Sequence, residues 1–174
     1  MNIEYNDLKS RGFSIGKDSL FRMMDEAFAI YLVARVERFD PSVVRREMSN
    51  RKAYLYDNGL ATPLKYPSAD DQDQGKLLEN LVFRHLGQAT EEIYFLRNGW
   101  ECGFVAFPQA GEPTLVQVTT KLDQDNLGRE IKGLDAGRTH LGTSTALLLY
   151  DTIQPGLDIP DWVRAVPVLE WVLT

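Results

Sequence analysis

Apolar positions along the chain repeat with two different periods, and these periods predict where helices and strands form. Helical spacing predicts helices over 7–11, 20–30, 76–86 and 125–139, the second capped at its start by Asp18 and Ser19. Alternating, β-branched or aromatic residues predict strands over 31–39, 53–57, 92–97, 101–107 and 114–122. A continuous apolar run over 145–150 predicts a buried strand, and 163–173 predicts a final short strand or helix. This mixture predicts an α+β fold.

A polar stretch divides the predicted elements into two groups. Residues 66–75 hold almost no apolar side chain, and Pro67, Gly75 and repeated Asp residues do not sustain a packed element. We therefore predict a linker or exposed loop there, with one domain at 1–66 and a second at 67–174. The elements predicted for the first domain are, in sequence order, two helices and a hairpin with a basic tip over 40–52, which is the order of a winged helix. The elements predicted for the second domain follow the order αβββαββ.

The distribution of charge limits what the chain can bind. The 174 residues include 19 Lys and Arg and 25 Asp and Glu, which gives a net charge of −6. This charge excludes a protein that binds nucleic acid over most of its surface, but it allows a local basic patch. Residues 1–66 have a balance of +2 and residues 67–174 a balance of −8. The candidate contacts to a DNA phosphate backbone are Lys17, Arg22, Arg35, Arg38, Arg45, Arg46, Arg51 and Lys52. The alternative is a solvated face, or a surface that contacts a partner protein.

The remaining composition predicts a compartment. Cys102 is the only cysteine, so no internal disulfide forms, which fits a reducing cytoplasm. No apolar run reaches the ~18 residues of a membrane helix, and the N-terminus lacks the apolar region of a signal peptide. We therefore expect a cytoplasmic protein without a membrane partner.

The second half contains residues that suggest nuclease chemistry. Glu79 lies on the predicted helix over 76–86, Glu101 begins the strand over 101–107, and Gln117 lies on the next strand. Helix, hairpin, strand and helix is the core order (αβββαβ) of the restriction-endonuclease-like, or PD-(D/E)xK, nucleases. Those enzymes use carboxylates and a Glu-x-Lys pair to hold Mg²⁺ and position water.

Several segments, in the same order, make the chain resemble one family over essentially its whole length. They are Asn6-Asp7-Leu8-Lys9, Asp18-Ser19-Leu20, Lys52-Ala53-Tyr54-Leu55-Tyr56-Asp57-Asn58-Gly59-Leu60, Leu78-Glu79-Asn80-Leu81-Val82-Phe83, Ile93-Tyr94-Phe95, Glu101-Cys102-Gly103-Phe104-Val105, Leu115-Val116-Gln117-Val118 and Arg129-Glu130-Ile131-Lys132-Gly133-Leu134. The chain resembles Domain of Unknown Function 4143, the C-terminal half of the AAA-type prokaryotic ATPases, without the ATPase half. The resemblance implies a winged-helix-like segment followed by a restriction-endonuclease-like core.

Two departures from the family pattern decide the expected function. Gly103 stands at the position of the metal-binding Asp, and Gln117-Val118-Thr119 stands where active nucleases have Glu-x-Lys. Only Glu79 remains of the usual site, and one carboxylate does not neutralise and orient a divalent ion. We therefore expect a non-catalytic DNA- or protein-binding, regulatory module with no cofactor. Its remnant site positions are Glu79, Glu101, Gln117 and Lys121.

Two alternatives stay open. Glu101 and Lys121 share strand faces with Gly103 and Thr119, so they could rebuild an active Mg²⁺-dependent nuclease with Glu79 as its metal ligand. Each lies about 7 Å along its strand from the original position, which argues against that nuclease. The other alternative is a protein-interaction domain that assembles with a separate AAA-type ATPase or with itself.

Overall fold

Six helices and seven strands make up the part of the chain that the structure, a computed structural model, describes: residues 2–60 and 71–174. The strands are β1 (Val33–Arg38), β2 (Lys52–Leu55), β3 (Ile93–Arg97), β4 (Glu101–Ala106), β5 (Thr114–Leu122), β6 (Ala146–Ile153) and β7 (Val163–Pro167). The helices are α1 (Asn2–Ser10), α2 (Lys17–Ala29), α3 (Val43–Met48), α4 (Asp71–Ala89), α5 (Gln124–Leu141) and α6 (Val168–Val172), with one 3-10 turn, η1 (Asn58–Leu60). The α+β class expected from the sequence is confirmed.

The strands form one mixed sheet in the order β2-β1-β3-β4-β5-β6-β7. Strands β3, β4 and β5 are antiparallel neighbours, whereas β5, β6 and β7 run parallel. Strand β1 pairs antiparallel with β2 and parallel with β3, so strands from both predicted domains belong to the same sheet. The boundary predicted near residue 66 falls between β2 and α4.

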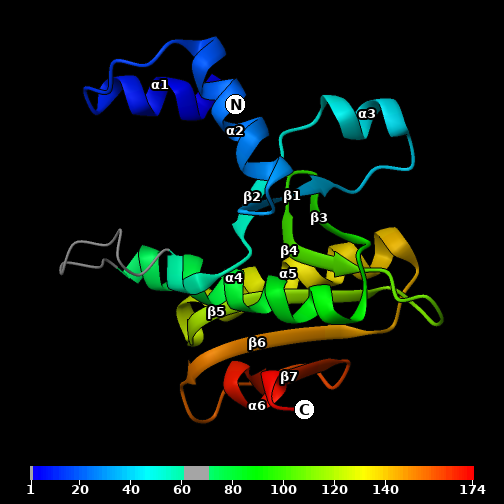
Figure 1. The fold of residues 1–174 in the computed structure, drawn as a ribbon. Coiled ribbons are helices and arrows are strands. Elements are labelled where there is room, and N and C mark those ends of the chain that lie inside the picture. Colours follow the sequence, from blue (N-terminus) through cyan, green and yellow to red (C-terminus); the bar gives the residue numbers. More distant parts are fainter. Residues whose placement is uncertain (1, 61–70) are drawn as a thin grey trace.

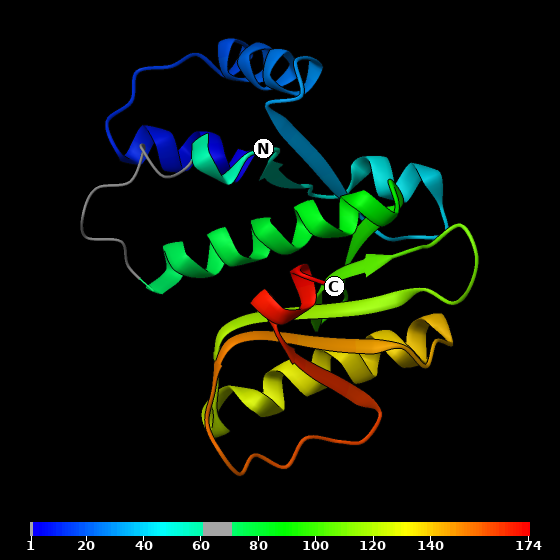
Figure 2. The ribbon, with the colours of Figure 1, turned by 60° about the horizontal axis from the view of Figure 1, so that its bottom comes forward.

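Helices cover both faces of this sheet. Helices α4 and α6 contribute Val82, Phe83 and Val168 to one apolar cluster, which also takes Val36 and Tyr54 from β1 and β2. Helix α5 contributes Leu127 and Leu134 to a second cluster on the other face. Figures 1 and 2 show α4 and α5 on opposite sides of the strands, with α1 and α2 standing away from β6, β7 and α6.

The starts of α2 and α4 differ from the sequence prediction. Helix α2 begins at Lys17 after Gly16, without a side-chain cap, so Asp18 and Ser19 lie inside its first turn and are not its cap. Helix α4 begins at Asp71 rather than at residue 76, so 71–75 is helical and only 66–70 of the predicted linker lies outside the described residues.

The predicted basic hairpin tip also contains a helix, α3. The Asp40 side chain accepts a hydrogen bond from the Ser42 backbone N–H at 2.9 Å, and Ser42 O then accepts from Arg46 N at 3.0 Å. A turn followed by good helix formers such as Arg and Met therefore starts a short helix instead of a loop. The two strands on either side of it do form the predicted antiparallel pair.

Candidate functional site

A cleft lies beside the beginning of β4 and the middle of β5. The two strands pair in register over 104–106 and 114–116. The cavity of about 650 Å³ contains three of the four remnant positions, Glu79, Glu101 and Gln117. It is lined by Lys52, Glu79, Arg97, Gly99, Trp100, Glu101, Gly103, Gln117, Val118, Arg129, Glu130, Lys132 and Gly133.

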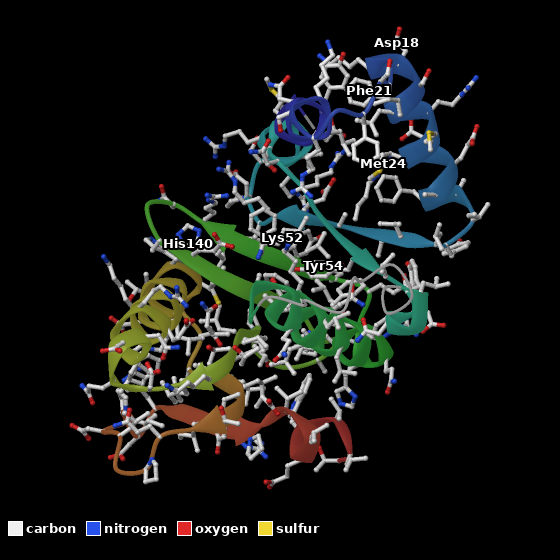
Figure 3. The ribbon with its side chains drawn as sticks, turned by 90° about the vertical axis from the view of Figure 1, so that its left-hand side faces the viewer. Asp18, Phe21, Met24, Lys52, Tyr54 and His140 are labelled. Atoms are coloured by element: carbon white, nitrogen blue, oxygen red, sulfur yellow. The ribbon has the colours of Figure 1, made fainter. Side chains whose placement is uncertain are left out.

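Lys52 joins two of these carboxylates. Its Nζ lies 3.0 Å from Glu79 Oε1 and 2.9 Å from Glu101 Oε1. The Tyr54 hydroxyl donates a further hydrogen bond to Glu79 Oε1 at 2.7 Å. Figure 3 shows Lys52 and Tyr54 where the N-terminal elements meet the rest of the molecule. The site therefore combines β2 from the first predicted domain with α4 and β4 from the second.

Electrostatics in this cluster favour the charged lysine. Burial alone would lower the pKa of Lys52, but attraction to Glu79 and hydrogen bonding to Glu101 outweigh burial and raise that pKa above its usual value. Burial and the nearby charge of Glu79 raise the pKa of Tyr54, so this hydroxyl stays protonated and donates. Lys52 therefore stays a cation at neutral pH and neutralises part of the charge of both carboxylates.

The Gln117 side chain on β5 links β4 to α5. Its Oε1 accepts a hydrogen bond from the Gly103 backbone N–H at 2.7 Å, and its Nε2 donates to Glu130 Oε2 at 2.6 Å. A Cβ at residue 103 would lie 3.4 Å from Gln117 Oε1 and 3.3 Å from Val116 O. The Gln117 amide thus fills the space beside residue 103, so the two departures from the nuclease pattern touch each other.

Glu130 is a buried carboxylate that the sequence analysis did not single out. It is 1% exposed and accepts hydrogen bonds from Gln117 and from Arg129, whose Nε lies 3.0 Å from Oε1. A sequence signal was present, because Glu130 shares a helical face with Gly133, Leu134 and Gly137, all of which are buried. In the sequence, residues 129–134 stand out only as a segment of the family resemblance.

The cleft holds four basic and three acidic side chains, a local balance of +1 in a chain of net charge −6. Its three carboxylates all have partners within the protein. Two of these partners, Arg97 beside Glu101 and Arg129 beside Glu130, are nevertheless 65% and 76% exposed. Within residues 2–60 and 71–174, no group of three or more His, Cys, Asp or Glu side chains is arranged to hold a metal ion. The arrangement therefore suits an anion better than a cation.

Lys121, the fourth remnant position, lies elsewhere. Its Nζ pairs with Asp123 Oδ2 at 3.0 Å, and Asp123 in turn caps α5 by accepting hydrogen bonds from the backbone of Asp125 and Asn126. Glu101 does approach Glu79, through Lys52, but Lys121 is not among the residues that line the cleft. The structure therefore brings together only part of the rebuilt nuclease site.

The basic residues of the first half mostly face carboxylates of that same half. Three of the eight candidate residues differ, and one of them is Lys52, which lines the cleft and pairs there with Glu79 and Glu101. Lys17 lies over the Phe21 ring, and Arg46 donates to the Tyr94 hydroxyl at 3.3 Å. The ion pairs are Arg22 with Glu26 at 3.9 Å, Arg35 with Asp25, Arg38 with Asp40 at 3.8 Å, Arg45 with Asp40 at 2.9 Å and Arg51 with Glu37 at 3.0 Å. Five of the eight candidate residues thus have a carboxylate partner within the first half.

A second, more apolar cavity lies between α1, α2, α3 and β2. It has a volume of about 550 Å³, and Phe21, Met24 and Phe28 of α2 line it together with Met48 of α3. Figure 3 shows Phe21 and Met24 on α2. Lys52 borders both cavities, which places β2 between them.

Comparison of the chain with family models, with curated proteins and with solved structures gives no match. Over the described residues, no helix has the length and apolar character needed to cross a membrane.

Proposed function

We propose that this chain is a non-catalytic DNA-binding module with a winged-helix-like beginning and a restriction-endonuclease-like core, related to Domain of Unknown Function 4143. The order of elements supports the core: α4 precedes the antiparallel strands β3, β4 and β5, and α5 leads to β6, which pairs parallel with β5. Two helices followed by the β1–β2 pair support the winged-helix-like part.

The observation that carries the proposal is the state of the carboxylates in the cleft. Glu79 and Glu101 share the Lys52 ammonium, and Glu130 is held by Arg129 and Gln117. A Mg²⁺ site needs carboxylate oxygens directed at the ion, and here these oxygens are engaged by donors of the chain itself. Metal-dependent hydrolysis is therefore not the activity that this arrangement favours.

The exposed cations of the cleft supply the binding chemistry. Arg97, Arg129 and Lys132 line the cleft from β3 and α5. Guanidinium and ammonium groups are the main protein contacts to DNA phosphates, and they bind with release of counterions. The net charge of −6 repels DNA at long range, so binding should be strongest at low salt.

The test is duplex binding measured by fluorescence anisotropy over a range of salt concentrations. Arg129→Ala combined with Lys132→Ala should weaken binding and reduce the slope of log K against log[salt] by about 0.9 for each phosphate that the variant no longer neutralises. Arg164→Ala is the matched control, because Arg164 is an exposed cation on β7 outside the cleft. An equal loss in the control, or no binding at ~50 mM salt, would contradict the proposal and favour a protein-interaction domain.

An active Mg²⁺-dependent nuclease is the second candidate function. The observation in its favour is that two carboxylates and a lysine, the residue types of such sites, meet in one cluster, with Glu79 and Glu101 each within 3.0 Å of the Lys52 ammonium. Plasmid incubated with the wild-type protein and Mg²⁺ or Mn²⁺ should remain uncut. Cleavage that Glu79→Gln abolishes would establish the nuclease instead.

A further inference from the structure

The cleft contains an aromatic side chain, Trp100, beside its exposed cations. Trp100 follows the turn at Asn98 and Gly99 that joins β3 to β4, and it lines the cavity of about 650 Å³. The residue is half-buried, because it packs against the second apolar cluster and meets the His140 ring edge-to-face, with ring centroids 6.3 Å apart. Figure 3 shows His140 near the end of α5. The indole is therefore held in place by the protein and still borders the cleft.

Three cations line the same cleft as this indole. Arg97 precedes Trp100 by three residues, on the other side of the turn. Arg129 and Lys132 lie three residues apart on α5 and therefore share one face of that helix. All three side chains are exposed. The cleft thus combines an aromatic side chain with groups that attract phosphate.

We propose that the cleft binds single-stranded DNA in preference to duplex, with a base stacked on Trp100 and the adjacent phosphates paired with Arg97, Arg129 and Lys132. This inference rests on the proposed function and names the form of DNA that the cleft takes. Proteins that bind single strands without sequence preference combine a cationic groove with aromatic side chains in this way, because every base has a face that can stack.

The aromatic contact favours unpaired bases over paired ones. In a duplex each base face is covered by its neighbours, so an indole can stack only on a base that has first been taken out of the stack. The cavity of about 650 Å³ is of the size that encloses small ligands, which gives room for one nucleotide unit. A single strand also has a lower charge density than a duplex, so a chain of net charge −6 repels it less.

The experiment measures binding of three labelled DNAs of equal length by fluorescence anisotropy at ~50 mM salt. They are a single strand, a duplex, and an abasic single strand that keeps the phosphates and lacks the bases. The wild-type protein should bind the single strand at least ~5-fold more tightly than either of the others, which is the lower end of what one stacked base contributes. Free dAMP at the concentration of the strand should not displace it, because it offers only one phosphate.

Trp100→Leu should lower the affinity for the single strand at least ~5-fold and leave the affinity for the duplex unchanged. Trp171→Leu is the matched control, because Trp171 is also half-buried and packs edge-to-face against a histidine, His85, but lies on α6 outside the cleft. It should change neither affinity. Trp100→Phe, which keeps an aromatic ring, should retain the preference for the single strand.

Several results would overturn the inference and leave DNA binding as such intact. These are equal wild-type affinities for the normal and the abasic strand, an equal loss in Trp171→Leu, and displacement of the strand by an equal concentration of dAMP. If Trp100→Leu does not fold, the wild-type comparison with the abasic strand decides the inference without any variant. Absence of binding to all three DNAs would instead refute the proposed function itself.

Discussion

Single polar residues join the first 60 residues to the rest of the molecule. Asn80 on α4 is 6% exposed, and its side chain accepts from Leu55 N at 2.7 Å and donates to Leu55 O at 2.9 Å. It therefore pairs with the edge strand β2 much as a neighbouring strand would. Asn80 also donates to Asn58 Oδ1 at 2.6 Å, and Asn58 donates to Leu77 O at 3.1 Å. Two sequence segments of the family resemblance thus contact each other directly.

Asn80→Ala should destabilise the fold by about 2 kcal/mol, because it leaves partly buried backbone groups of Leu55 without their partner. Urea unfolding followed by circular dichroism measures the change. Gln88→Ala, an exposed position on the same helix, should change stability by no more than about 0.5 kcal/mol. A similar loss in both variants would contradict the role given to Asn80.

The single cysteine is expected to be chemically inert in the native protein. Burial raises the pKa of the Cys102 thiol to about 12, so almost no thiolate exists at pH 8. A disulfide reagent such as DTNB should label Cys102 only after unfolding. Rapid labelling of the native protein at pH 8 would show that β4 opens at its first residues.

The raised pKa of Cys102 also predicts how the stability of the fold changes at alkaline pH. The folded thiol keeps its proton up to about pH 12, whereas the unfolded thiol loses it near its usual value of 9.0. The unfolded state therefore binds fewer protons between these values, and stability falls as pH rises through that window. Cys102→Ser should lessen this decline when the urea midpoint is measured against pH from 8 to 11.

At the scale of elements, α5 shows how packing overrides local preference. Glycine weakens an isolated helix, and α5 contains Gly128, Gly133 and Gly137. Two of these lie where the helix meets the sheet: a Cβ at Gly133 would be 2.2 Å from Glu101 O, and one at Gly137 would be 3.0 Å from a Leu115 methyl. The missing side chains let α5 lie against β4 directly under the cleft.

Gly133→Ala should therefore destabilise the protein by about 3 kcal/mol and displace the backbone of Glu101. Gly128→Ala is the matched control on the same helix, because a Cβ there meets no atom within 4 Å. It should stabilise the fold by about 0.5 kcal/mol through helix propensity. Thermal unfolding of the two variants measures both changes in stability. A stabilising Gly133→Ala would contradict the close approach of α5 to the backbone of β4.

At the scale of the whole molecule, the cleft depends on both predicted domains. Lys52 and Tyr54 come from β2, whereas Glu79, Glu101 and Gln117 come from α4, β4 and β5. The apolar cluster beneath α4 likewise includes Val36 and Tyr54. Strand β1 covers the edge of β3 that would otherwise lie at the end of the sheet.

A chain of residues 71–174 alone should consequently be much less stable than the full chain. Removing β1 and β2 uncovers Phe83, Phe95 and Phe104, whose rings pack in the same cluster as Tyr54. We expect a lower urea midpoint and binding of the dye ANS to the exposed apolar surface. An unchanged midpoint would mean that the second part folds independently of the first.

The kind and order of most elements can be predicted from the sequence, because helical and strand periodicity are local properties of the chain. The strand over 114–122 was predicted to the residue, whereas α3 was not, since its start depends on the Asp40 turn. The contact of Lys52 with Glu79 and Glu101 could not be predicted in this way, because it depends on tertiary packing. That contact joins positions 27 and 49 residues apart, and the packing of α4 against the sheet together with the order of the strands brings them together.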